Sequence, residues 1–163
     1  YLHFWYRFVD PARSLISQGL GNELWTKDIE TKLGEFVSKP AFEWVARDYL
    51  WRALRLGILP EECRFVDVGT WWGGGDIEID VMAINVERQP VIVGSCKWTS
   101  SPMGLAELNA LRRDVIRAGF DVSGLHYALL SRSGFNQPLK DYVAQNPDQQ
   151  VILIDLEQLF AVS

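Results

Sequence analysis

Hydrophobic and polar residues follow helical spacing in the first third of the chain and strand-like spacing from residue 64 onward. Apolar residues that recur at helical intervals predict three helices in the first part: residues 11–18, 26–37 and 41–56. In the second part, short apolar runs and period-two alternation are joined by two further helical patterns. The elements predicted there are, in order, strands 64–69, 76–85 and 91–98, helix 103–119, strand 125–131, helix 136–145 and strand 151–156.

From residue 41 onward this order is αβββαβαβ, which is typical of an α/β fold with a mixed sheet and helices packed on its faces. We expect residues 41–163 to form this domain and residues 1–40 to form an N-terminal helical extension that packs on its core. At 163 residues, the chain is long enough to bury a core of ordinary size.

Acidic residues gather on one side of the second predicted strand. Asp76, Glu78 and Asp80 alternate with Ile77, Ile79 and Val81. If this strand forms a hairpin with residues 91–98, turning at Glu87 and Arg88, Asp80 faces Ser95 and Glu78 faces Lys97. Directly opposed residues share a face and lie about 5 Å apart at Cβ. The acids and the lysine would then meet in one patch, whereas a slip of one residue would break the alignment.

Such a patch suits a hard divalent cation, which prefers oxygen ligands. A neighbouring lysine could position a water molecule and offset the charge of a phosphate. The alternative is structural, because alternating acids usually form the solvated face of a strand. Lys97 lies in the apolar run of residues 91–98, which places it either at a sheet edge or at a functional site.

Two segments of the sequence carry a resemblance to a known group of proteins. Residues 71–81, WWGGGDIEIDV, and residues 91–98, VIVGSCKW, resemble the PD-(D/E)xK nuclease superfamily. In particular they are similar to the nuclease-like domain at the C-terminus of archaeal-type P-loop ATPases. Residues 4–9, FWYRFV, and 42–47, FEWVAR, resemble the same family, so that the likeness covers nearly the whole chain.

The resemblance implies a restriction-endonuclease-like αβββαβ core and a Mg²⁺- or Mn²⁺-dependent DNA endonuclease, with an ATPase domain as the upstream partner. Asp80 matches the metal-binding aspartate of the superfamily, and Lys97 matches its catalytic lysine. Glu43 lies in the helix where many members place a further acid that holds metal or orients water. The alternatives for Glu43 are an exposed helix charge or an ion pair with Arg47.

Ser95 departs from the family pattern, which has glutamate at this position. A serine hydroxyl is neutral, so the expected metal site, made of Asp80, Glu43, Glu78 and Ser95, lacks one negative charge. Either Glu78, Glu43 or Glu107 compensates, or the domain is a catalytically inactive module that binds DNA or protein beside an ATPase. We expect nuclease activity to be impaired or absent.

Composition adds few constraints. A net charge of −5 argues against a uniformly basic nucleic-acid surface. Two cysteines without metal-type spacing and the absence of a long apolar run favour a cytoplasmic protein without a membrane partner. The chain opens at Tyr1 without an initiating methionine, so we expect it to belong to a longer protein. Further expectations concern single residues. We expect core or interdomain packing rather than base stacking for Trp71 and Trp72, and a packed His126. We expect Arg112, Arg113 and Arg117 to form a basic stripe on a solvated helix face, with contact to a phosphate backbone as the alternative.

Overall fold

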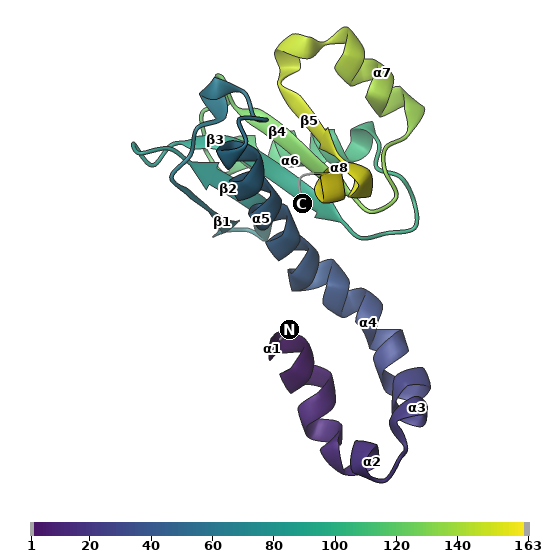
Figure 1. The fold of residues 1–163 in the computed structure, drawn as a ribbon. Helices are drawn as coiled ribbons and strands as arrows, with labels where there is room; N and C mark the ends of the chain where they lie inside the picture. The colour runs from purple at the N-terminus through teal and green to yellow at the C-terminus, as the bar shows by residue number, and fades with distance from the viewer. Residues whose placement is uncertain (1, 162–163) are drawn as a thin grey trace. The chain divides into compact units, whose positions relative to one another are not determined.

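The computed structural model describes residues 2–161, and its helices and strands follow the predicted order (Figure 1). The chain divides into two compact units, Tyr1–Lys39 and Pro40–Ser163. The break falls at Lys39, whose backbone is extended (φ −145°, ψ 126°) between two helical stretches. Residues that precede a proline disfavour helical geometry, which accounts for the extended backbone of Lys39.

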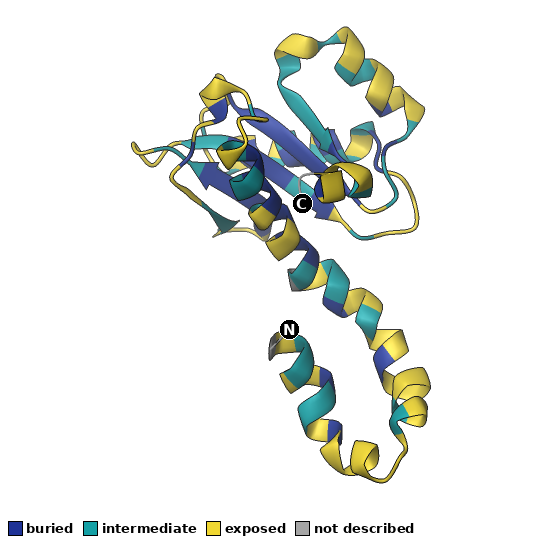
Figure 2. Cartoon of the chain, viewed as in Figure 1, coloured by how far each residue is buried: buried dark blue, intermediate teal, exposed yellow. Residues whose placement is uncertain are grey.

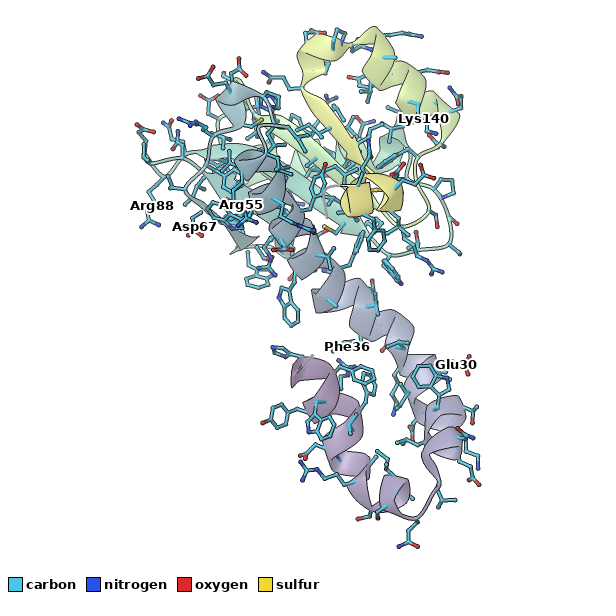
Figure 3. The ribbon with its side chains drawn as sticks, in the orientation of Figure 1. Glu30, Phe36, Arg55, Asp67, Arg88 and Lys140 are labelled. Atoms are coloured by element: carbon cyan, nitrogen blue, oxygen red, sulfur yellow. The ribbon has the colours of Figure 1, made fainter. Side chains whose placement is uncertain are left out.

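The first unit is built from short helical segments with a turn at residues 18–20. Its elements are α1 (Leu2–Phe4), π-helical Trp5–Val9, 3-10-helical Asp10–Ala12, α2 (Arg13–Ser17), α3 (Gly21–Leu24), π-helical Trp25–Ile29 and α4 (Glu30–Phe36). Aromatic rings from its first and last helical segments, those of Phe4, Phe8 and Phe36, pack together. The Phe8 ring lies 5.2 Å from that of Phe4 and 5.4 Å from that of Phe36, measured between ring centroids. Phe36 points from α4 toward the first helical segment of this unit (Figure 3).

The second unit contains a five-stranded sheet in the order β1-β2-β3-β4-β5. Strands β1, β2 and β3 are antiparallel, and β3, β4 and β5 are parallel. The elements of this unit are α5 (Phe42–Arg55), 3-10-helical Glu61–Cys63, β1 (Asp67–Gly73), β2 (Ile77–Ile84), β3 (Pro90–Lys97), α6 (Leu105–Arg117), β4 (His126–Ser131), α7 (Gln137–Gln145), 3-10-helical Pro147–Gln149, β5 (Val151–Ile154) and α8 (Leu156–Ala161). The predicted α/β class and the order αβββαβαβ are therefore confirmed, and α8 is an additional element.

Two apolar cores lie on opposite faces of this sheet. Leu50 of α5 and Leu159 of α8 pack in one core, and Leu108 of α6 and Leu139 of α7 pack in the other. Figure 1 shows α5 and α6 on opposite faces, and Figure 2 shows the central strands largely buried between them. Each fully buried leucine contributes about 1.5–3 kcal/mol of transfer free energy, so these two layers fix the positions of the strand ends.

The hairpin between β2 and β3 has the predicted register near its middle, where Val81 pairs with Gly94 and Met82 with Val93. The chain turns at Glu87 and Arg88, as predicted, and Arg88 lies at the tip of the hairpin (Figure 3). The ladder ends at the Val81–Gly94 pair. The prediction that Glu78 faces Lys97 directly is therefore wrong.

A β-bulge between β1 and β2 explains the difference. Gly69 pairs with Met82 and Trp71 pairs with Ile79, so that Thr70 lies opposite two residues, Asp80 and Val81. The extra residue reverses the alternation of faces along β2. Ile79 packs in the core beneath α6, whereas Val81 packs in the core beneath α5. Their predicted location on a common face is wrong, and the bulge is the physical reason.

Strand β1 also runs further than predicted, because the chain reverses only at residues 74–76. Gly75 and Asp76 both have positive φ, +77° and +60°. Glycine adopts this conformation without steric cost, and aspartate tolerates it better than most residues. No helix among residues 2–161 combines the length and the apolar character needed to cross a membrane.

Candidate metal centre

Three carboxylates converge at the end of the sheet where β2 and β3 separate. They belong to Glu43 on α5 and to Glu78 and Asp80 on β2, and one oxygen from each lies within 4.8 Å of the others. Glu43 and Asp80 are only 5% and 8% exposed. We call these three residues the acidic group. All three were candidate metal ligands in the sequence, Glu78 and Asp80 from one predicted strand and Glu43 from the preceding helix, and the fold brings them together.

Glu43 is held in the first turn of α5, where the helix dipole favours an acid. The hydroxyl of Thr70 lies 3.5 Å from Oε2 of Glu43 and 3.2 Å from the main-chain oxygen of Asp80. Nε of Arg47 donates to the main-chain carbonyl of Glu43 at 3.2 Å. The interpretation of Glu43 as an exposed helix charge is therefore wrong, and Thr70 links α5 to the bulge.

Asp80 is fixed by groups of β3. Its Oδ2 accepts hydrogen bonds from the main-chain N–H of Cys96 at 2.8 Å and from the hydroxyl of Ser95 at 3.2 Å. The Asp80 carboxylate thus accepts a main-chain hydrogen bond from β3 just beyond the last β2–β3 pair, Val81–Gly94, where the two strands diverge. Burial raises the pKa of the Cys96 thiol well above its ordinary value, and the charges of Asp80 and Glu43 raise it further. The thiol therefore stays protonated and behaves as a packing residue.

Ser95 and Lys97 occupy different places relative to the acidic group. Ser95 contacts Asp80 directly. Lys97 is the last residue of β3, and its side chain is exposed. Because residues two apart on a strand share a face, Lys97 leaves β3 on the same side as Ser95 and opposite Cys96. Its main-chain carbonyl accepts a hydrogen bond from the main-chain N–H of Arg132 at 3.0 Å.

Glu107, one of the three acids considered as a substitute for the missing glutamate, has a different role. Its Oε2 accepts a hydrogen bond from the main-chain N–H of Gly104 at 2.9 Å, at the start of α6. It caps the helix and is not among the three grouped acids. Glu43 and Glu78 are the acids that the fold brings to Asp80.

The donor set of the acidic group fits a hard divalent cation such as Mg²⁺ or Mn²⁺, which takes carboxylate oxygens and keeps part of its water shell. Two unit charges 4.8 Å apart repel each other by about 3.5 kcal/mol at an effective dielectric constant of about 20. A cation bound among the three carboxylates reduces this repulsion. The arrangement can therefore hold a metal.

Among the basic side chains of α6, two are engaged within the fold. Arg112 donates to the hydroxyl of Tyr142 at 3.0 Å and to Oε1 of Gln149 at 3.1 Å. Arg117 forms a salt bridge with Asp114 at 3.3 Å. The predicted solvated stripe is therefore wrong for Arg112, which ties α6 to α7 and to the turn that follows it.

Of the remaining residues singled out in the sequence, two are packed within the fold and one is exposed. His126 is 5% exposed, in agreement with the prediction of a packed residue. Trp71 packs against Phe120 with 5.1 Å between ring centroids, as expected for a core residue. Trp72 is 70% exposed, so Trp72 is not a core residue, and the alternative of interdomain packing stays a prediction.

Comparison with known proteins gives the family of the chain. Residues 5–111 match the family model DUF234, described as archaeal and bacterial proteins of unknown function. The chain belongs to the DUF234 family. The DUF234 match includes the acidic group, Ser95 and Lys97, and it ends within α6. No curated protein and no solved structure matches the chain significantly. Membership of DUF234 therefore assigns no activity, and function has to be argued from the site.

Proposed function

We propose that this DUF234 domain is a PD-(D/E)xK-type nuclease domain that binds Mg²⁺ or Mn²⁺ through the acidic group and hydrolyses DNA phosphodiesters with a weakened site. The observation that carries the proposal is the convergence of Glu43, Glu78 and Asp80, two of them almost fully buried. The order αβββαβ and the mixed sheet are consistent with this superfamily. In keeping with the resemblance, we further propose that an ATPase domain lies upstream.

In this proposal, each side chain has a distinct role. Glu43, Glu78 and Asp80 hold the cation, and the Cys96 N–H and Ser95 hydroxyl keep the Asp80 carboxylate in place. A bound cation would supply positive charge to the phosphate and lower the pKa of a water molecule. Lys97 would orient the attacking water and offset negative charge on the phosphate oxygens.

The reaction is a hydrolysis that needs no other co-reactant. The water oxygen forms a new bond to phosphorus, and the bond from phosphorus to one deoxyribose oxygen breaks. The water gives up one proton to solvent, and the departing oxygen takes one up. The atoms of one water molecule are thereby divided between the two products.

Ser95 is the reason for calling the site weakened. Its hydroxyl occupies the place beside Asp80 where the superfamily has a carboxylate, so one negative charge is missing. Glu78 is the acid that we propose as its substitute. It belongs to the acidic group and comes from the same strand as Asp80.

A second candidate function is a catalytically inactive module that binds DNA or protein beside an ATPase. Two observations favour it. Ser95 weakens the donor set, and the net charge of −5 disfavours tight binding to duplex phosphates.

Calorimetry with Mn²⁺ and cleavage of plasmid and branched DNA in Mg²⁺ or Mn²⁺ separate the two functions. For an active nuclease, we expect Asp80→Asn to abolish metal binding and cleavage, and Lys97→Ala to abolish cleavage while metal still binds. Glu107→Gln is the matched control, because it removes an acid outside the acidic group. Absence of both metal binding and cleavage in the wild type would establish the inactive module. Metal binding without cleavage, with activity gained by Ser95→Glu, would establish a degenerate nuclease.

A further inference from the structure

Trp72 projects from the strand that borders the acidic group. It is 70% exposed and pairs directly with Glu78 across the β1–β2 ladder. Cross-strand partners share a face, with Cβ atoms about 5 Å apart. Its neighbour Trp71 pairs with Ile79 and packs on Phe120, on the opposite face. An indole therefore lies beside an acid of the proposed metal site and outside the core.

Contacts on either side of Trp72 tie its strand to the rest of the unit. The Trp71 ring packs over Gly73, where an added Cβ would lie only 2.1 Å from that ring. Nη2 of Arg117 approaches the main-chain oxygen of Gly75, in the turn that follows, at 3.4 Å. An exposed tryptophan on an anchored strand is a flat apolar surface, available to a ligand without the loss of much conformational freedom.

A positively charged side chain, that of Arg132, lies on the other side of the acidic group in the strand order. Arg132 directly follows β4, and its guanidinium lies 5.1 Å from the centroid of the Trp98 ring. Trp98 in turn packs on Phe42, the residue before Glu43, with 5.1 Å between ring centroids. From β1 to β4, the strand ends therefore present an aromatic ring, the acidic group and then a guanidinium.

We infer that Trp72 is a base-stacking platform and that the site takes single-stranded DNA. This inference rests on the proposed nuclease function and specifies its substrate class. A base can stack on Trp72 only when its face is free, as it is in a single strand. The net charge of −5 leaves little electrostatic attraction for a duplex, so stacking has to supply much of the affinity. Arg132 would bind a phosphate on the far side of the acidic group.

Fluorescence anisotropy tests the inference on residues 1–163, with a labelled thymidine oligonucleotide about 12 nucleotides long and the matching duplex, both in Ca²⁺. We expect the single strand to bind at least about 10-fold more tightly than the duplex. Trp72→Ala should weaken single-strand binding by about 5- to 150-fold, the range for loss of one stacked base. Trp72→Phe should retain most of the affinity. Arg132→Ala should make the slope of log affinity against log salt shallower by about 0.7, the value for one phosphate contact on a single strand.

Phe160→Ala is the matched control, because Phe160 on α8 is 72% exposed and lies on the second unit as well. The inference is overturned if Trp72→Ala and Phe160→Ala have the same effect, if the duplex binds as tightly as the single strand, or if neither binds. Calorimetry with Mn²⁺ on the same variants separates this failure from that of the proposed function. Trp72→Ala should bind Mn²⁺ like the wild type. Wild-type protein that binds the single strand through Trp72 but binds no Mn²⁺ would refute the metal site alone.

Discussion

Replacing Ser95 with glutamate adds a fourth carboxylate to the acidic group. The Ser95 hydroxyl lies 3.2 Å from Oδ2 of Asp80, so a glutamate at this position places its charge within about 4 Å of one already present. Two like charges 4 Å apart repel by about 1 kcal/mol in bulk water and by about 4 kcal/mol at an effective dielectric constant of about 20. Without metal, we therefore expect Ser95→Glu to lower the free energy of unfolding by about 1–4 kcal/mol.

A divalent cation should reverse this effect, because it is attracted to four carboxylates instead of three. A ligand that binds only the folded state stabilises it by about 2.7 kcal/mol at 100 times its Kd. If Ser95→Glu tightens Mn²⁺ binding about 10-fold, saturating metal gives the variant about 1.4 kcal/mol more stabilisation than the wild type. The same substitution is thus expected to destabilise the protein in EDTA and to increase its response to Mn²⁺.

Urea unfolding in EDTA and at a series of Mn²⁺ concentrations measures both effects, and calorimetry gives the Kd for Mn²⁺ independently. Ser95→Gln is the control, since glutamine has the size of glutamate without its charge. It should show only the steric cost of a longer side chain and no gain in Mn²⁺ affinity. Equal destabilisation by Ser95→Glu and Ser95→Gln, with Mn²⁺ responses like that of the wild type, would refute the electrostatic argument and the assignment of this region as a metal centre.

Three further predictions address neighbouring features. Thr70→Val removes the hydroxyl that links Glu43 to the bulge, so it should cost about 1 kcal/mol in urea unfolding and weaken Mn²⁺ binding in calorimetry. Glu107→Gln keeps an oxygen for the helix cap, so it should change the unfolding free energy by less than about 1 kcal/mol and leave Mn²⁺ binding unchanged. Burial, helped by the charge of Glu62, raises the pKa of the Cys63 thiol from 9.0 to about 12. Between pH 9 and 12 the folded thiol therefore keeps its proton while the unfolded thiol loses it. In urea unfolding over this pH range, the wild type should lose stability relative to Cys63→Ala, by at most about 1.4 kcal/mol per pH unit.

The strand pattern was sufficient to predict the middle of the β2–β3 hairpin. This part of the sheet is covered on both faces, so the successive residues Val81, Met82 and Ala83 are all apolar. Their partners on β3 lie in the predicted register. The order of the later elements followed for the same reason. Two buried layers impose apolar periodicity on every helix and strand that contributes to them.

The bulge at Asp80 could not be predicted from that pattern. Alternation along residues 76–81 is equally regular with or without an extra residue, because the bulge is defined by the partner strand, where Thr70 opposes two residues. The prediction ended the first strand before Thr70, and the pairing that reveals the bulge was therefore missing. The same error left Trp72 outside any predicted strand, so that its exposure on the face opposite Trp71 could not be predicted.

Glu43 was named as a candidate metal ligand from the resemblance, whereas its burial and its contact with Thr70 depend on the tertiary structure. In the sequence it is one acid in an amphipathic helix, four residues before Arg47. That spacing is as compatible with an exposed helix charge or an ion pair as with a metal ligand. Only the packing of α5 on the sheet, through Ala46 and Leu50, brings its first turn to β2.

The position of Ser95 also bears on why this acidic group persists in a folded domain. Repulsion among three ionised carboxylates costs stability in the absence of a cation, and two of the three here are nearly buried. A fourth at position 95 would raise that cost together with the metal affinity, because the same charges govern both. Serine keeps the hydrogen bond that fixes Asp80 and omits the charge. Under the proposed function, serine at position 95 would therefore favour a stable metal-free state with weak metal binding, and the metal concentration, together with a substrate phosphate as a further ligand, would decide when the site is loaded.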